Sequence, residues 1–302
     1  MSAPTPLEQA PAGLAPSRRV YLKREDVHEL GAFKWRGALP VLERYAAEGA
    51  RGVVTASTGN HGAATAWAAA RLGLTATVYA PTVTSRTKLA HLTRLGADVI
   101  KTGADVDEAK EAASAHAEAV GLPFFEDGAE LAQLDGYATI GTEILDALGE
   151  APAAVVVPVG NGALLAGIGR VLGERSPGTR RVGVVAKEAP VMARSWDARR
   201  VVESDRCATI ADGLAVRIAI PVAVEWLNDA ADAMLEVSER EIARAVAAYD
   251  AAGIRAEPAA AAALAALSQI AAEGAIVLII TGRNVDDELF ARCCADSASF
   301  SD

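Results

Sequence analysis

Short apolar runs alternate with amphipathic or alanine-rich segments along most of the chain. The runs that predict strands lie at 20–23, 52–56, 75–80, 98–101, 153–159, 182–186 and 275–281. The segments that predict helices lie at 60–72, 85–95, 104–120, 238–252 and 257–272. Strands that alternate with helices in this way are typical of a parallel sheet covered by helices. The pattern therefore predicts an α/β fold.

Two of the predicted helices carry recognisable end signals. Gly73 directly follows the helix over 60–72, and glycine suits the left-handed conformation that is common just after a helix. Ser238 and Glu241 have the spacing of a capping box at the start of a later helix, and Gly253 stands at its end. These signals predict where both helices stop.

Length and charge exclude several classes of function. The chain has 302 residues, which is enough for about two domains. Its 29 basic and 39 acidic residues give a net charge of −10, so we expect neither nucleic acid nor an anionic membrane as a partner. The longest strongly apolar runs, 153–159 and 275–280, are too short to cross a bilayer, and no signal peptide is recognisable. We therefore expect a soluble, cytoplasmic protein.

Potential metal ligands and disulfide partners are few. Cys293 and Cys294 are adjacent and Cys207 stands apart, which does not form a disulfide framework. The four histidines are scattered, and neither CxxC nor HExxH spacing occurs. We expect no structural zinc site and a reducing compartment.

Three loops that follow predicted strands could bind a ligand. They are STGNHG at 57–62, GNGAL at 160–164 and TGRN at 281–284. In open α/β sheets ligands bind at the carboxyl ends of strands, and a glycine-rich loop at a helix start favours an anion such as phosphate. The second loop alone could be a tight turn or half of a dinucleotide fingerprint. Leu165 interrupts that fingerprint, so a nicotinamide-dependent enzyme is a minor alternative.

Lys34 lies between small and aromatic residues in the segment GAFKWRGA at 31–38. Removal of water from around a lysine amine favours its neutral form, which can act as a nucleophile or form a Schiff base. A surface lysine beside a core phenylalanine would have the same local sequence. This segment alone therefore leaves both interpretations open.

Seven motifs in order decide between these interpretations: LKRED, GAFKWRGA, STGNHG, PVGNGALLAG, IADGLAV, EPAAAA and TGRN. Their order and spacing resemble the pyridoxal-phosphate enzymes of the tryptophan-synthase-β type (fold type II), most closely the serine/threonine dehydratase and serine racemase branch. The resemblance covers residues 5–287. It implies two α/β domains, each with a parallel sheet between helix layers, and pyridoxal 5′-phosphate in the cleft between them. The smaller domain would span 52–130, and the larger one 1–48 with 131–302.

The resemblance also implies roles for individual residues. Lys34 would form the Schiff base and remove the Cα proton of the substrate, Asn60 would contact the 3′-oxygen of the ring, and Thr281 would face the ring nitrogen. The cofactor phosphate would be held by the backbone of Gly160, Asn161, Gly162, Ala163 and Leu164. The substrate carboxylate would lie near Ser57, Thr58 and His61, with Thr58 in the place of the catalytic serine of the racemases. Glu257 would lie near the ring or only begin a helix, Asp212 and Gly213 would shape the pocket wall, and Asn284 would brace the Thr281 loop.

The hydroxyl of Thr281 bears on the reaction type. A neutral group at the ring nitrogen makes the ring a weaker electron sink than a carboxylate would, which suits β-elimination or β-replacement better than transamination. The resemblance therefore implies a lyase, a dehydratase or ammonia-lyase, that converts a serine- or threonine-like β-hydroxy amino acid to a 2-oxo acid and ammonia. We also expect a homodimer.

Two alternatives to this function remain open. A cysteine-synthase-like β-replacement is disfavoured because those relatives usually carry threonine after the asparagine, where this chain has His61. A catalytically silent, cofactor-binding protein is disfavoured because Lys34, Asn60 and Thr281 are all retained.

The chain departs from its apparent relatives in several places. Ala186, Val191 and Met192 stand where racemase-like members carry cation-binding acids, so we expect no metal. Leu30 replaces a small polar residue, and the run at 136–139 is GYAT where many dehydratases have GQGT. The chain ends soon after the TGRN loop, and we expect no regulatory domain beyond it.

Overall fold

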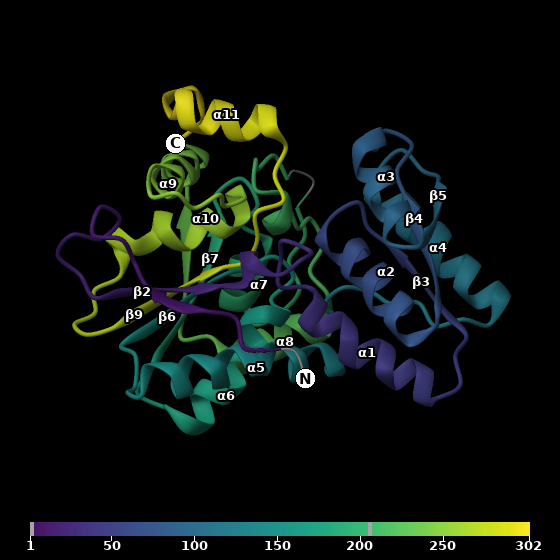
Figure 1. Ribbon diagram of the computed structural model, residues 1–302, viewed down its shortest axis with the longest axis horizontal. Coiled ribbons are helices and arrows are strands. Elements are labelled where there is room, and N and C mark those ends of the chain that lie inside the picture. Colours follow the sequence, from purple (N-terminus) through teal and green to yellow (C-terminus); the bar gives the residue numbers. More distant parts are fainter. Residues whose placement is uncertain (1–2, 205–206) are drawn as a thin grey trace. The chain divides into compact units, whose positions relative to one another are not determined.

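The computed structural model describes residues 3–204 and 207–302 and is shown in Figure 1. The chain forms two compact units, one made of Met1–Ala32 with Tyr137–Asp302 and the other of Phe33–Gly136. Each contains a sheet with parallel strands and the helices that connect them. The predicted α/β class is confirmed.

The larger unit is built on a six-stranded sheet with the strand order β1-β2-β9-β6-β7-β8. The strands are β1 (Leu7–Gln9), β2 (Val20–Arg24), β6 (Ala154–Pro158), β7 (Arg180–Ala186), β8 (Ala233–Val237) and β9 (Ile276–Ile280). Only the edge strand β1 is antiparallel to its neighbour among these strands; the other pairs are parallel. Every residue of β6 and β9 is buried, because helices cover both faces of a parallel sheet. This explains why both segments read as continuous apolar runs.

Helices cover both faces of this sheet. They are α5 (Leu131–Leu148, which begins in the smaller unit), α6 (Ala163–Arg175), α7 (Val191–Ala198), α8 (Pro221–Ala230), α9 (Glu239–Ala251), α10 (Pro258–Ala265) and α11 (Asp287–Ala295). In Figure 1, α9 and α10 lie on one side of the sheet and α5 and α6 on the other. Short 3-10 turns occur at Glu25–Val27, Asp212–Leu214, Ala266–Gln269 and Ser297–Ser299. The main core lies between the sheet and α9 with α10, where Tyr249 is fully buried.

The smaller unit contains a three-stranded parallel sheet with the order β3-β4-β5. Its elements are α1 (Trp35–Ala47), β3 (Gly52–Ala56), α2 (Asn60–Leu72), β4 (Thr75–Ala80), α3 (Arg86–Arg94), β5 (Ala97–Lys101) and α4 (Val106–Val120). After α4 the chain runs beside β3. Phe125 N donates to Val54 O at 2.8 Å, and Val54 N donates to Pro123 O at 3.0 Å. This pairing places residues 125–128 beside the end of β3.

The boundaries of the units differ from the expected limits at 48, 52 and 131. Helix α1 belongs to the smaller unit because it packs on α2, where the rings of Trp35 and Trp67 meet edge to face with centroids 6.2 Å apart. A side chain at Gly136 would collide with the carbonyl oxygen of Arg36, so glycine lets the start of α5 approach α1 closely. Lys34, which we expected in the larger domain, therefore lies in the smaller unit.

The helix-end signals are confirmed, but one predicted helix is too long. Gly73 is left-handed at a φ of 68°. Ser238 and Glu241 form both hydrogen bonds of a capping box. The helix predicted over 257–272 is wrong at its end, because α10 stops at Ala265 and a 3-10 turn follows to Gln269. Among the described residues, no helix is long and apolar enough to cross a membrane.

Candidate active site

In the larger unit, two of the predicted ligand-binding loops leave the same edge of the sheet. Strands β6 and β9 are neighbours and parallel, with Ala154 opposite Ile276 and Val156 opposite Leu278. Their carboxyl ends therefore lie side by side. The loop at 160–164 follows β6, and Thr281 directly follows β9. This edge is the position at which open α/β sheets bind ligands.

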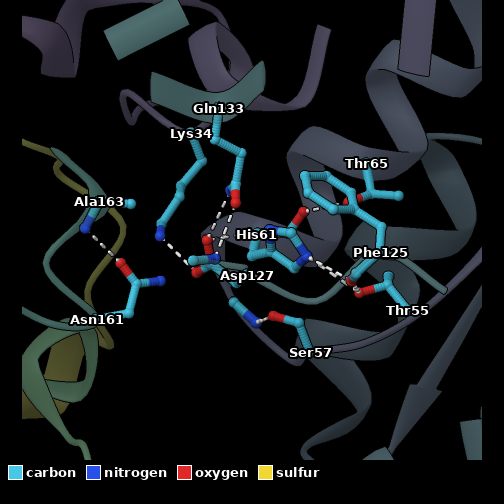
Figure 2. A network of polar contacts seen from close by, with 12 residues as sticks. Lys34, Thr55, Ser57, His61, Thr65, Phe125, Asp127, Gln133, Asn161 and Ala163 are labelled. Atoms are coloured by element: carbon cyan, nitrogen blue, oxygen red, sulfur yellow. Dashed lines mark hydrogen bonds and ion pairs between the residues drawn. The ribbon is translucent and has the colours of Figure 1, made fainter. Parts of the chain in front are cut away.

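The loop after β6 has a backbone conformation that suits the binding of an anion. Gly162 is the N-cap of α6 and has a φ of 93°, a conformation that other residues rarely adopt. A side chain at Gly160 would collide with the carbonyl oxygen of Gly213, which packs against the loop. Asn161 Oδ1 accepts a hydrogen bond from Ala163 N at 3.1 Å, as Figure 2 shows. The N–H groups of a first helical turn have no acceptor within their helix, so this loop could hold a phosphate.

Thr281 presents an unpartnered hydroxyl at the end of β9. Its side chain is only 3% exposed, and Oγ1 has no hydrogen-bond partner among the described residues. A buried hydroxyl without a partner costs about 1–3 kcal/mol, and a ligand with a complementary polar atom would remove that cost. A phosphate cradle and a buried, unpartnered hydroxyl at one sheet edge fit a phosphorylated pyridine such as pyridoxal 5′-phosphate.

Glu257 and Asn284 fasten the Thr281 loop within the larger unit. Asn284 N donates to Glu257 Oε2 at 3.2 Å, and Asn284 Nδ2 donates to the carbonyl oxygen of Leu30 at 2.7 Å. Glu257 N donates in turn to Gly282 O at 3.0 Å. A side chain at Gly282 would lie 2.8 Å from the Glu257 carboxylate. The Glu257 carboxylate therefore accepts a hydrogen bond from the backbone of this loop, and Asn284 braces the loop as expected.

In the smaller unit, the sequence STGN connects β3 to the start of α2. Ser57 Oγ accepts a hydrogen bond from Gly59 N at 3.2 Å, and Ser57 and Thr58 are half-buried. Asn60 is the first residue of α2. The N-cap residue is Gly59, which has no side chain to cap the helix. A side chain at Gly62 would lie 2.8 Å from the carbonyl oxygen of Ser57. The helix N-terminus therefore stays close to the loop, where its N–H groups favour a carboxylate.

Lys34 precedes α1, and its amine is paired with a carboxylate. Lys34 Nζ donates to Asp127 Oδ2 at 2.5 Å, and the Lys34 side chain is 16% exposed. The amine also lies 5.1 Å from the centroid of the Phe33 ring. The sequence indicated only small and aromatic neighbours, so Asp127 was missed. The available signal was the acidic pair at 126–127, directly after two phenylalanines.

Asp127 accepts hydrogen bonds from two donors, Lys34 and Gln133, and lies near His61, as Figure 2 shows. Asp127 Oδ1 accepts from Gln133 Nε2 at 3.1 Å, and Gln133 Oε1 accepts from Gly128 N at 2.8 Å. His61 Nδ1 lies 3.6 Å from Asp127 Oδ1. Burial would raise the pKa of Asp127, but the positive charge of Lys34 and its hydrogen bond outweigh burial and hold that pKa well below its usual range. The carboxylate therefore stays ionised beside Lys34.

The imidazole of His61 points into the smaller unit. Its Nε2 lies 3.0 Å from Thr55 Oγ1 and 3.3 Å from the carbonyl oxygen of Phe125. The Thr55 hydroxyl donates its single proton to that same carbonyl oxygen at 2.7 Å. Nε2 therefore carries a proton and donates, which leaves Nδ1 unprotonated in the neutral ring. Burial lowers the pKa of His61 below its ordinary value, although Asp127 opposes this shift.

Comparisons with known proteins agree with this geometry. Residues 2–282 match the model of the family described as "Pyridoxal-phosphate dependent enzyme". The chain is 35% identical to the L-threonine ammonia-lyase of Geobacter sulfurreducens, over 88% of this chain and 67% of that protein. It is 34% identical to the L-threonine ammonia-lyase of Thermotoga maritima, over 90% and 69% of the two chains. The processed form of threonine deaminase isoform 2 from Solanum lycopersicum superposes with a TM-score of 0.91 at 30% identity, covering 99% of this chain and 89% of that one. The predicted resemblance to fold type II enzymes is confirmed.

Proposed function

Because this chain belongs to the pyridoxal-phosphate dependent enzyme family, we propose that it releases ammonia from a serine- or threonine-like β-hydroxy amino acid by β-elimination. The organic product would be a 2-oxo acid. Two relatives that are at least 34% identical are named L-threonine ammonia-lyases, which supports a substrate of this class. The homodimer and the cytoplasmic location stay predictions from the sequence.

The observation that carries this proposal is the buried, unpartnered hydroxyl of Thr281. A hydroxyl is neutral, so it cannot stabilise a proton on a ring nitrogen as a carboxylate would. Chemistry that depends on a strong electron sink is disfavoured at such a site, whereas loss of a β-hydroxyl needs the substrate carbanion only briefly. The residue type at the end of β9 therefore supports elimination.

The chain's own residues divide the remaining work. Bound pyridoxal 5′-phosphate supplies an electron sink for the negative charge at the substrate Cα. Its phosphate would be held by backbone N–H groups of the 160–164 loop at the start of α6, and Asn60 would orient the ring. The Lys34 amine, once free and neutral, would remove the Cα proton. Ser57 and Thr58 would bind the substrate carboxylate at the positive end of α2.

A panel of β-hydroxy amino acids tests the proposed reaction. We expect the full chain loaded with cofactor to release 2-oxo acid and ammonia in equal amounts from L-threonine or L-serine, with no second substrate added. Chromatography of the 2-oxo acid and an ammonia assay follow the two products. Turnover that requires an added thiol and yields a substituted amino acid would instead indicate β-replacement.

We also expect chelators to leave the activity intact. Ala186, Val191 and Met192 are apolar where a cation site would need acids, and the described residues contain no group of three His, Cys, Asp or Glu side chains placed to hold a metal ion. Assays before and after treatment with EDTA should therefore give the same rate. Loss of activity in EDTA and its return with magnesium would show that a cation site exists elsewhere.

A further inference from the structure

Lys34, Asp127 and His61 form a chain of titratable groups inside the smaller unit, as Figure 2 shows. We propose that Asp127 is a positioning residue for Lys34, and that His61 takes up, through Asp127, the proton that Lys34 gives up before it reacts. The proposal rests on the role of Lys34 in the proposed function. It assigns to His61 a part beyond contact with the substrate carboxylate.

The need for such an acceptor follows from the ion pair. An amine attacks a carbonyl carbon, or removes a Cα proton, only in its neutral form. In the structure Lys34 Nζ forms an ion pair with the Asp127 carboxylate and donates to Oδ2 at 2.5 Å. The Lys34 side chain is only 16% exposed and its amine faces Asp127, so this carboxylate, itself 26% exposed, is the nearest acceptor for the proton.

His61 is built to be that partner. Its Nε2–H donates to Thr55 Oγ1 and to the Phe125 carbonyl oxygen, which fixes the orientation of the ring. Nδ1 is then the ring nitrogen that can accept a proton. Nδ1 lies 3.6 Å from Asp127 Oδ1, the carboxylate oxygen that Lys34 does not bind. Gln133 holds the carboxylate between the two bases through its donation to Oδ1. The ring therefore presents Nδ1 toward the carboxylate, and the two atoms must approach to less than 3.6 Å for a proton to pass.

The transfer balances without an added reagent. A Lys34 Nζ–H bond breaks and the proton passes to Asp127 Oδ2. Rotation of the carboxylic acid group about Cβ–Cγ exchanges the two oxygens, so that Gln133 Nε2 then donates to Oδ2 in place of Oδ1. The rotation brings the proton on Oδ2 to His61 Nδ1, where an N–H bond forms and Asp127 becomes a carboxylate again. One positive and one negative charge are present before and after, so the cluster, of which His61 is the buried member, gains no net charge. A change in net charge at such a site would be costly.

Electrostatics couples the two ends of this chain. The charged groups that act on His61 are Asp127, Lys34 and, more weakly, Glu126. Burial lowers the pKa of His61 most, Asp127 raises it, and the positive charge of Lys34 lowers it. When Lys34 loses its charge, it no longer lowers the pKa of His61, while the negative charge of Asp127 still raises it. His61 thus becomes a better acceptor as Lys34 becomes neutral.

Titration of the His61 Cε1–H signal by NMR tests the coupling in the full chain without cofactor. We expect Lys34→Met to raise the pKa of His61 by about one unit or more, because the ammonium is gone and Asp127 is left without it. The double variant Lys34→Met/Asp127→Asn should lose that rise, and Lys34→Met/Asp127→Glu should keep most of it. Glu126→Gln removes the adjacent carboxylate, which pairs with Lys110, and serves as the matched control with a smaller effect.

The outcomes separate this proposal from the proposed function. If His61 titrates in Lys34→Met as it does in the parent, or if the rise survives Asp127→Asn, the relay is wrong. A thermal melt of each variant shows whether it is folded, and the Asp127→Glu pair keeps the test decisive if the Asn variant unfolds. Because the titration needs no cofactor, a coupling can be found even if the Schiff base forms elsewhere. Equally, the proposed reaction can hold where the coupling fails.

Discussion

Replacement of Lys34 by alanine should lower the rate of 2-oxo acid release by about 10³-fold or more, since the group that removes the Cα proton is lost. The same variant should lose the visible absorbance of cofactor bound through a Schiff base. Stopped assays of 2-oxo acid formation and an absorbance spectrum of the protein with pyridoxal 5′-phosphate measure both effects. Lys34→Ala also leaves Asp127 without its ammonium partner, so the fold of this variant needs a control.

Lys34→Arg is the matched control for that change. Arginine can keep an ion pair with Asp127, but it stays charged and forms no Schiff base with the cofactor. We expect Lys34→Arg to melt near the parent and yet to be as inactive as Lys34→Ala. The exposed Lys187, replaced by arginine, should retain full activity. Elimination by Lys34→Arg at the parent's rate would remove Lys34 from the reaction.

Replacement of Thr281 by aspartate should also have a large effect on elimination. The anionic side chain would stabilise a proton on the ring nitrogen, because a nearby opposite charge favours the protonated form. The stronger electron sink should slow release of 2-oxo acid by about 10-fold or more, equivalent to about 1.4 kcal/mol in the barrier. A new long-wavelength absorbance band should also develop when substrate is added. Rate measurements and spectra of the loaded variant give both readouts.

Two further substitutions at this position separate charge from packing. Thr281→Ser preserves the hydroxyl and should retain substantial activity. Thr281→Asn is close to aspartate in size but neutral, so it should produce no long-wavelength band. Because Thr281 is buried, the unfolding of the aspartate variant is measured alongside. If Thr281→Asp eliminates as fast as the parent and shows no new band, the hydroxyl does not control the ring.

The strands and several helix ends could be predicted because local chemistry fixes them. Strands β3 and β4 match the predicted runs at both ends, and Gly73 and the Ser238 capping box mark real helix boundaries. The end of α10 was not predictable from its alanine run, since alanine favours a continued helix and neither glycine nor proline occurs at 265–270 to mark the stop. The antiparallel β1 was missed because a strand of three residues gives no readable periodicity.

The loops of the candidate site could be found from the sequence, but the partners of their side chains could not. Glycine-rich segments after apolar runs locate the 160–164 and 281–284 loops, since sheet topology alone places ligand-binding loops there. Asp127 is 93 residues from Lys34 in the chain, and only the pairing of Phe125 with Val54 carries it beside β3. The orientation of His61 depends in the same way on Thr55 and the Phe125 carbonyl oxygen, two groups that no motif joins.

Borohydride reduction of the loaded protein, followed by peptide mapping, tests the central claim most directly. Reduction converts a Schiff base into a stable secondary amine, so the labelled peptide identifies the lysine that carries pyridoxal 5′-phosphate. The chain has six lysines, of which Lys34 alone lies in the GAFKWRGA motif. We expect the label on Lys34, and we expect it to be lost in Lys34→Arg. Label on any other lysine of the parent protein would contradict the assignment of Lys34 and the mechanism built on it.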